Sequence, residues 1–445
     1  MKRTSHVNSG TSYGKNIPVT VLALWCAMIS FSQEVVRETM VGKGWAGNSV
    51  NAVIFRKNSV VSYKNMQFTG YYDEGGVLTL AMRKLKDTVW TVRKTVYKGK
   101  VSDAHNTISM AIDGDGYLHV SWDHHNTPLR YARSLRPLDL ELGAEQPMTG
   151  AEEAKVTYPE FYNLPGGDLL FFYRSGSSGR GNMVVNRYDT KHKVWKPLHR
   201  NLIDGEEERS AYWQACVDDE GVIHLSWVWR ETWDVASNHD LCYARSYDGG
   251  KSWEKSTGEK YGLPIREATA EYAWRVPENS GLINQTSMTS DSRGNPYIAT
   301  YWNSGAVTQY QVVYLQNGTW KKQATGFRKV PFRLGGGGTK KIPLSRPQLL
   351  LAEKKGDTDL YLIFRDEERG NKVSLAGIKA GSRETWSVSD LSSSSVGQWE
   401  PSYDTQLWRD RGELHLFVQD VSQEDGEGLT EKAATDIRVL EISGF

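Results

Sequence analysis

The chain has 445 residues, of which 39% are hydrophobic and 24% are charged, so it is long enough to bury a large core and too apolar to be intrinsically disordered. Its formal net charge is +1, which gives no reason to expect a nucleic acid as a partner. We therefore expect one globular body or an array of repeats.

The first predicted element is a signal peptide over residues 1–32. Basic residues precede an apolar run at 17–31, and small serines stand shortly before Gln33. About fifteen apolar residues are too few for a comfortable membrane span and are typical of an export signal, the alternative being a buried terminal strand. We expect residues 33–445 to form a single domain, secreted or periplasmic, not bound to a membrane and monomeric.

A repeated unit follows, made of a short apolar strand, a tight turn with Asp and Gly, and a second strand of alternating apolar residues. Clear copies are "DGDGYLHVSW" at 113–122 and "DDEGVIHLSW" at 218–227. The turn glycines are Gly75, Gly116, Gly167, Gly221, Gly294, Gly356 and Gly412. They lie 41 to 73 residues apart, a spacing typical of four-stranded propeller blades. The sequence therefore predicts an all-β fold, a seven-bladed β-propeller closed by pairing of its last segments with the N-terminal strand region.

Three features predict architecture rather than chemistry. The segment "SYDGGKSW" at 246–253 resembles the Asp-box of sialidase-type propellers, which braces a hairpin at the rim. His119 and His224 share one strand position, "LHVSW" and "IHLSW", and are predicted to be packing residues. The run "LGGGGTKK" at 334–341 precedes no helical pattern and is predicted to be a flexible linker between blades.

Removal of the signal peptide leaves Cys216 and Cys242, too few for a disulfide framework. We place them on the first and third strands of one blade, about 9–10 Å apart, which exceeds the reach of a disulfide of about 7 Å. Both are expected to be free thiols.

The start of a blade's first strand and the end of its second strand lie at the same face, because the tight turn between them lies at the other. His105 begins one first strand, and His124 and His125 follow the second. Successive strand residues point to opposite sides, so only one of this pair can face the channel.

The next three blades bring further side chains to that face by the same rule. They are Tyr158 and Arg174, then Tyr212 and Arg230, then Asn284 and Asn303. Loops at strand ends are where such folds commonly bind ligands. We predict a site at one rim of the central channel.

Histidine, tyrosine and arginine together suit β-elimination on a uronic acid. An arginine paired with the uronate carboxylate stabilises the charge that develops when the C5 proton leaves. An imidazole can take that proton, and a tyrosine hydroxyl can donate to the departing O4 or act as the base itself. The catalytic candidates are His105, His125, Tyr158 and Arg174. The candidates for substrate binding are His124, Asn106, Tyr212, Arg230, Asn284 and Asn303, although strand-end polar residues also cap blade edges.

The segments "DAHNTIS", "SWDHHNTPLRYARS", "TYPEF", "FFYRSGSSGRGN" and "NQTSM" resemble the seven-bladed propeller polysaccharide lyases of families 25 and 24, which carry BNR-type repeats and cleave ulvan, a sulfated rhamnose–uronate polymer. The resemblance spans most of residues 33–445 and is strongest over 103–182. Those lyases use two histidines about twenty positions apart, as His105 and His125 are, and a tyrosine and an arginine sixteen apart, as Tyr158 and Arg174 are. The resemblance implies β-elimination of an acidic sulfated polysaccharide, which yields an unsaturated uronate at the new non-reducing end.

The resemblance also implies a further substrate-side histidine, for which His239 is the candidate, and allows a structural zinc or calcium ion. His239 and Cys242 are the candidate ligands, although two residues do not make a zinc site. The elimination chemistry itself needs no cofactor.

Two other functions remain open from the sequence. One is a propeller glycoside hydrolase that acts on rhamnose–glucuronate linkages, which would ordinarily need two convergent carboxylates. The other is a non-catalytic propeller that binds carbohydrate through its Trp and Tyr side chains. Formation of an unsaturated uronate distinguishes the lyase from both.

Overall fold

The structure is a computed structural model that describes residues 1–6, 10, 33–354, 356–380 and 385–445. The chain divides into two units, Met1–Ser32 and Gln33–Phe445. The apolar run of the predicted signal peptide, residues 17–31, lies outside the described residues. The fold reported below is that of the second unit.

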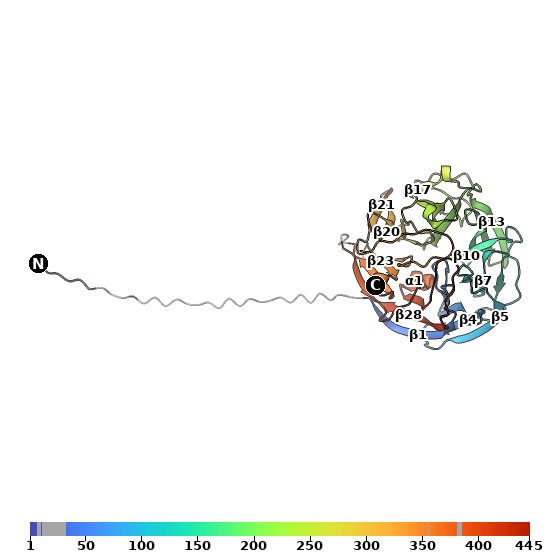
Figure 1. Ribbon diagram of the computed structural model, residues 1–445, viewed down its shortest axis with the longest axis horizontal. Helices are drawn as coiled ribbons and strands as arrows, with labels where there is room; N and C mark the ends of the chain where they lie inside the picture. Colours follow the sequence, from blue (N-terminus) through green and yellow to red (C-terminus); the bar gives the residue numbers. More distant parts are fainter. Residues whose placement is uncertain (7–9, 11–32, 355, 381–384) are drawn as a thin grey trace. The chain divides into compact units, whose positions relative to one another are not determined.

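Within the described residues of this unit, the strands form seven antiparallel sheets that succeed one another around a ring, as the colours of Figure 1 show. The first three sheets contain β2 (Val60–Tyr63), β3 (Met66–Tyr72), β4 (Val77–Lys84) and β5 (Thr91–Lys98); then β6 (Ile108–Ile112), β7 (Leu118–Trp122) and β9 (Tyr131–Arg133); then β8 (His125–Thr127), β10 (Val156–Asn163), β11 (Leu169–Ser177), β12 (Arg180–Asp189) and β13 (Val194–Ile203).

The next three sheets contain β14 (Ser210–Val217), β15 (Ile223–Arg230), β16 (Asn238–Ser246) and β17 (Glu271–Trp274); then β18 (Ser287–Ser290), β19 (Pro296–Asn303), β20 (Thr308–Gln316) and β21 (Thr319–Ala324); then β22 (Gln348–Lys354), β23 (Asp357–Phe364), β24 (Ser374–Ile378) and β25 (Ser387–Asp390). Short 3₁₀ helices interrupt the loops at η1 (Val235–Ser237), η2 (Glu267–Thr269) and η3 (Glu367–Arg369).

The seventh sheet joins the two ends of the propeller unit. It contains β26 (Ser402–Tyr403), β27 (Leu414–Gln419), β28 (Thr435–Ser443) and β1 (Glu34–Gly44). Strand β1 pairs antiparallel with β28 along its whole length, and the two lie side by side in Figure 1. The predicted all-β, seven-bladed β-propeller and its closure are confirmed.

Local turn chemistry explains why the blades form where the sequence predicts them. In the second sheet the Asp113 carboxylate accepts from the backbone N–H groups of Asp115 and Tyr117, at 3.0 and 2.9 Å. Gly116 has φ +87°, a left-handed conformation that glycine adopts without steric cost. The turn closes β6 onto β7, and the same pattern recurs at Asp218.

Two of the seven copies differ from the prediction. The copy around Gly75 joins the second and third strands of its sheet, β3 and β4, rather than the first and second. In the closing sheet the connection between β26 and β27 is α1 (Thr405–Arg411), which Asp404 caps at its N-terminus and Gly412 ends at φ +65°. None of the helices in the described residues is long and apolar enough to cross a membrane.

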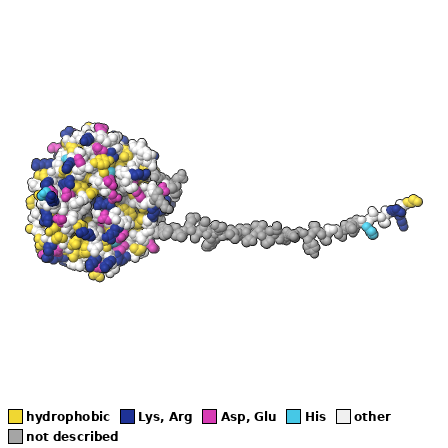
Figure 2. All heavy atoms as spheres, turned by 180° about the vertical axis from the view of Figure 1, so that it is seen from behind, with side chains coloured by type: hydrophobic (Ala, Val, Ile, Leu, Met, Phe, Trp, Pro, Cys, Tyr) yellow, Lys and Arg dark blue, Asp and Glu magenta, His cyan; other side chains and the backbone are white. Residues whose placement is uncertain are grey.

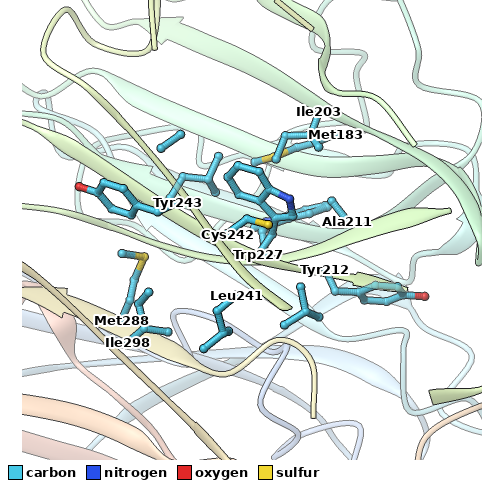
Figure 3. Close-up of a cluster of buried hydrophobic side chains, with 14 of the residues drawn as sticks. Met183, Ile203, Ala211, Tyr212, Trp227, Leu241, Cys242, Tyr243, Met288 and Ile298 are labelled. Atoms are coloured by element: carbon cyan, nitrogen blue, oxygen red, sulfur yellow. The ribbon is translucent and has the colours of Figure 1, made fainter. Parts of the chain in front are cut away.

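The hydrophobic core lies between neighbouring sheets. Figure 3 shows Trp227 and Cys242 of one blade packed beneath Met183 of the preceding blade. Trp227 is fully buried, and burying a large apolar side chain contributes about 1.5–3 kcal/mol. Each sheet therefore buries both of its faces against its neighbours.

The cysteines and the strand histidines lie where they were predicted. Cys216 is on β14 and Cys242 on β16, the first and third strands of one sheet, and both are free thiols. His119 is buried with its ring nitrogens bonded to Asp113 Oδ2 and the Tyr131 hydroxyl. Figure 2 shows Lys and Arg interspersed with Asp and Glu over the visible face of the propeller unit, as the net charge of +1 leads one to expect.

Candidate active site

A cavity of about 220 Å³ collects most of the predicted site residues. Its lining includes His105, His125, Tyr158, Arg174, Tyr212, Arg230 and Asn284. They come from the starts of first strands and the ends of second strands in successive sheets. The blade geometry expected from the sequence thus brings these side chains together.

A larger cavity of about 690 Å³ lies among the tight turns between first and second strands. Its walls include Asp218, Ser290 and Glu353. None of the site residues predicted from the sequence lines it. The candidate chemistry is therefore confined to the smaller cavity at the other ends of these strands.

His125 reaches the cavity through an unexpected strand. It begins β8, which leaves its own blade and pairs with β10 of the next sheet, with Thr157 opposite His125. The sequence places His125 simply after the second strand of its blade. The crossing sets His125 next to Tyr158, because the two residues now belong to one sheet.

Tyr158 has an unusual backbone conformation. Its φ is +58°, and a β-bulge interrupts β10 between Thr157 and Glu160. A bulky residue in the left-handed region costs about 1–3 kcal/mol and occurs mainly where function requires it. The bulge turns the Tyr158 side chain into the cavity, where its ring centroid lies 5.3 Å from Phe55 and 5.8 Å from His105.

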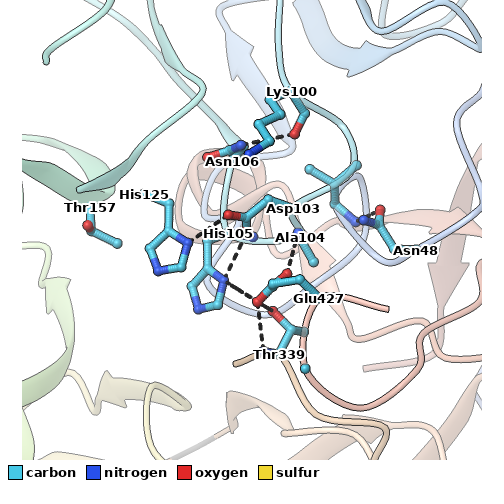
Figure 4. Close-up of polar contacts among 12 residues, drawn as sticks. Asn48, Lys100, Asp103, Ala104, His105, Asn106, His125, Thr157, Thr339 and Glu427 are labelled. Carbon is cyan, nitrogen blue, oxygen red and sulfur yellow. Dashed lines mark hydrogen bonds and ion pairs between the residues drawn. The ribbon is translucent and has the colours of Figure 1, made fainter. Parts of the chain in front are cut away.

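Two carboxylates hold the two imidazoles (Figure 4). Asp103 bridges them, with Oδ2 2.7 Å from His125 Nδ1 and Oδ1 3.1 Å from His105 Nδ1. Glu427 Oε1 lies 3.0 Å from His105 Nδ1. The two rings stack with centroids 4.0 Å apart. Both Nδ1 atoms are thus tied to carboxylates, which leaves Nε2 as the reactive nitrogen of each ring.

This network sets the charge of His105. Burial alone lowers its pKa, but the Asp103 and Glu427 carboxylates outweigh burial and raise the pKa of His105 above its ordinary value. In the same network, burial alone would raise the pKa of Glu427, but the hydrogen bond and charge of His105 lower it. The two carboxylates therefore favour the imidazolium form of His105.

The two tyrosines of the cavity differ in acidity. Burial, together with the nearby Tyr212, raises the pKa of Tyr158 in spite of the surrounding arginines. For Tyr212 burial acts in the same direction, but the Arg174 and Arg230 guanidiniums outweigh it and lower the pKa of Tyr212. Of the two, Tyr158 therefore holds its proton more tightly.

Arg174 and Arg230 are buried cations that flank Tyr212. Arg174 donates from Nη1 to the Tyr212 hydroxyl at 3.1 Å and from Nε to Gly176 O at 3.2 Å. A Cβ at Gly181 would lie 2.5 Å from Arg174 Cδ, so only glycine leaves room for this side chain. Within the described residues neither arginine forms an ion pair with a carboxylate. The pair is therefore available to an anionic ligand.

Four predicted binding residues do not line the cavity. His124 is fully buried with Nε2 3.0 Å from Ser121 Oγ, and Asn106 donates to Lys100 O at 2.9 Å. His239 lies between two carboxylates, and Asn303 accepts a hydrogen bond from Thr308. Each of the four thus makes at least one polar contact within the propeller, although Asn106 Oδ1 and His124 Nδ1 are buried without a hydrogen-bond partner among the described residues.

Several residues of the site were not predicted from the sequence. The glycine run at 334–341, predicted to be only a linker, lines the cavity with Thr339 and Lys340. Glu427 comes from the loop between β27 and β28. Asp103 could have been suspected, because it stands two positions before His105 and accepts from His105 N at 2.9 Å. Nothing local in the sequence connects Glu427 with this site.

The predicted metal pair, His239 and Cys242, does not fit a metal site. His239 Nε2 is 2.9 Å from Glu231 Oε1 and Nδ1 is 3.0 Å from Asp240 Oδ2, so both nitrogens are engaged. Cys242 is buried in the hydrophobic core, and burial raises the pKa of its thiol, whereas a ligand must be a thiolate. The geometry therefore gives this pair no support as a metal site.

Another group in the described residues has the composition of a metal site. The potential ligand atoms of Asp103, His105 and His125 lie within 4.8 Å of one another. A ligating histidine must be neutral, yet the raised pKa of His105 favours its protonated form, and both Nδ1 atoms already contact Asp103. The arrangement fits a hydrogen-bonded imidazole pair better than a cation.

A family profile described as "BNR repeat-containing family member" matches residues 66–328, more than half of the chain. The chain belongs to this BNR repeat-containing family. The matched segment covers β3 to β21 and includes the four catalytic candidates. Glu427 and the glycine run lie beyond it.

Characterised relatives of this BNR repeat protein include "Ulvan lyase" of Alteromonas sp. (strain LOR) and "Ulvan Lyase-PL25" of Pseudoalteromonas sp. (strain PLSV). Both are 23% identical to this chain, over 237 and 236 residues respectively. Each match covers 45% of this chain and 47% of the relative. The chain thus spans about half the length of the curated relatives it matches. The crystal structure of polysaccharide lyase Uly1 covers 92% of this chain and 99% of its own, with a TM-score of 0.66 and 17% identity. This similarity shows that the two proteins share the fold.

Proposed function

We propose that the protein is a polysaccharide lyase that cleaves an acidic, sulfated, uronate-containing polysaccharide of the ulvan type by β-elimination. The observation that carries the proposal is the convergence of His105, His125, Tyr158 and Arg174 in one cavity. The described lining contains three arginines, a lysine and two histidines but no carboxylate, which suits an anionic substrate. The relatives named ulvan lyase, and a structure titled as an ulvan lyase bound to -[GlcA(1-4)Rha3S]- with a TM-score of 0.64, support it.

In the proposed mechanism Arg174 and the His105 imidazolium neutralise the uronate carboxylate, so that the C5 proton becomes acidic. His125 Nε2 takes the C5 proton, and the electron pair of the C5–H bond forms the C4–C5 double bond. The C4–O4 bond breaks, and Tyr158 gives its proton to the departing O4. The raised pKa of Tyr158 suits a proton donor.

Incubation of the purified protein with uronate polysaccharides should generate the ultraviolet absorbance of an unsaturated uronate. Elimination creates this conjugated double bond, whereas hydrolysis of the same linkage does not. The measurement is absorbance against time, with reducing ends counted in parallel. Reducing ends without absorbance would indicate the hydrolase instead, and binding without either would indicate a carbohydrate-binding propeller.

Glu427→Gln should shift the alkaline limb of the pH profile of kcat/KM to lower pH by about one unit. Ala104 N and Thr339 N donate to Oε2 and Oε1 of Glu427 respectively, so glutamine keeps an acceptor for only one of these N–H groups, and it removes the negative charge beside His105. The pKa of His105 then falls, and His105 loses its proton at a lower pH. Because the mechanism needs the imidazolium, activity disappears sooner as pH rises.

Glu424→Gln is the matched control, because Glu424 lies in the same loop and pairs with the exposed Lys341. Its pH profile should coincide with that of the unmodified protein. Equal profiles for Glu427→Gln and Glu424→Gln would contradict the role given to Glu427, even if both variants had lower activity.

We also propose that residues 1–32 are a signal peptide and that the mature protein acts in the periplasm or outside the cell, as a monomer. The proposal is supported by the basic and apolar pattern of the first 32 residues and by the polymeric nature of the proposed substrate. The N-terminal residue of the secreted protein would test it: we expect cleavage near Gln33.

A further inference from the structure

Trp233 is an exposed aromatic residue at the cavity that the mechanism does not use. It lies between the end of β15 and η1, lines the cavity, and leaves 66% of its surface exposed. An apolar ring that remains exposed to water does not contribute the stabilisation that its burial would provide. A large exposed ring beside a ligand cavity is therefore a candidate contact for a ligand.

The segment that carries Trp233 is fastened to the glycine run. Asp234 Oδ1 accepts from Gly336 N at 2.7 Å and from Ala236 N at 2.8 Å. Val235 N donates to Gly336 O at 3.0 Å. The indole thus projects from a backbone held on both sides, which reduces the conformational entropy lost when a ligand contacts it.

Gly337 provides the seat for the indole. A Cβ at this position would lie 2.7 Å from Trp233 Cε3 and 3.2 Å from Cζ3. Only glycine therefore allows the six-membered ring to lie against the backbone at this point. One part of the ring is covered in this way, and the rest remains open beside the cavity.

Arg230 supplies an independent indication of a ligand at the same place. It is 93% buried, with 7% of its surface exposed, and lines the cavity. Its Nη2 donates to Trp233 O, whereas its Nε has no hydrogen-bond partner in the described residues. A buried guanidinium with an unsatisfied N–H is stabilised by an anionic or polar ligand.

We propose that Trp233, seated on Gly337, is a stacking platform for the pyranose that adjoins the cleaved uronate, and that Arg230 binds a polar or anionic substituent of that sugar. The apolar C–H face of the pyranose packs on the indole, while Arg174 binds the uronate itself. This inference rests on the proposed function and adds a second sugar subsite to it.

The test is a calorimetric titration of oligosaccharides from the polymer into Tyr158→Phe protein with or without Trp233→Ala. For a tetrasaccharide, Trp233→Ala should weaken binding about tenfold, and a single uronate should bind equally to both. Gly337→Ala displaces the ring without removing it and should weaken binding about threefold. The thermal unfolding temperature should be unchanged by Trp233→Ala, because the ring is mostly exposed.

Two controls match these changes. Tyr247→Ala removes another exposed aromatic, 62% exposed and not among the residues that line the cavity, and Gly262→Ala adds a methyl group with nothing within 4 Å. Both should bind the tetrasaccharide as the parent does. Tetrasaccharide binding within twofold of the parent for Trp233→Ala, or equal losses for the single uronate and the tetrasaccharide, would overturn the platform. Tight binding by the parent without any elimination by the unmodified protein would instead overturn the proposed function and leave the platform standing.

Discussion

Tyr158→Phe is expected to lower kcat by about 10²- to 10⁴-fold, the contribution typical of a general acid. The change removes one hydroxyl from a ring that packs against Phe55 and Tyr212 at centroid distances of 5.3 and 5.9 Å. The ring and its packing persist, so substrate affinity and the unfolding temperature should change little. The readout is initial rate against substrate concentration, with calorimetric unfolding in parallel.

Tyr131→Phe is the control for loss of a buried tyrosine hydroxyl. Tyr131 is 1% exposed, its hydroxyl contacts His119 Nδ1 at 2.7 Å, and it does not line the cavity. This variant should lose about 1 kcal/mol of stability and keep its turnover, the opposite of Tyr158→Phe. If Tyr158→Phe retained more than about a tenth of the turnover, the loss would be too small for an essential proton donor.

Arg174→Lys is expected to lower kcat by about 10²- to 10³-fold, although the charge is conserved. The guanidinium plane is fixed by its bonds to Gly176 O and the Tyr212 hydroxyl. A lysine ammonium is a point charge that cannot reproduce the two-pronged contact of a guanidinium with a carboxylate. The developing charge of the elimination step would then lose its best partner, and kcat should fall more than the affinity.

Arg187→Lys is the matched substitution away from the cavity. Arg187 pairs with Asp168 through Nε and Nη2, at 3.1 and 2.9 Å, and is partly exposed. Turnover of this variant should stay within about twofold, as expected for a partly exposed ion pair with no contact to substrate. If Arg174→Lys behaved in the same way, the uronate carboxylate would have to be bound elsewhere.

The blades could be predicted because their signals are local. Alternation of apolar residues and the Asp/Gly turn, as at Asp113 and Gly116, each involve only a few neighbouring residues. Two copies were predicted incorrectly because the same local residue pattern occurs there at a different connection. Gly75 follows the second strand of its blade, and Gly412 ends a helix.

The list of catalytic candidates followed from the strand order, but their arrangement did not. The strand order predicts that His105, Tyr158 and Arg174 share a face. It does not reveal that Tyr158 sits in a bulge at φ +58°, or that β8 transfers His125 to the next sheet. Both features depend on how one blade pairs with another.

From the residue pattern alone one obtains the seven-bladed propeller and the side chains at one rim of its channel, because strands and turns are encoded by residues close in the chain. The charge environment of His105 and the packing of Trp233 on Gly337 could be determined only from the folded structure. Glu427 meets the His105 segment across a separation of 323 positions at Ala104, and Gly337 meets Trp233 from another blade connection. Such contacts are set by ring closure and packing between blades, so no short segment of the sequence carries a signal for them.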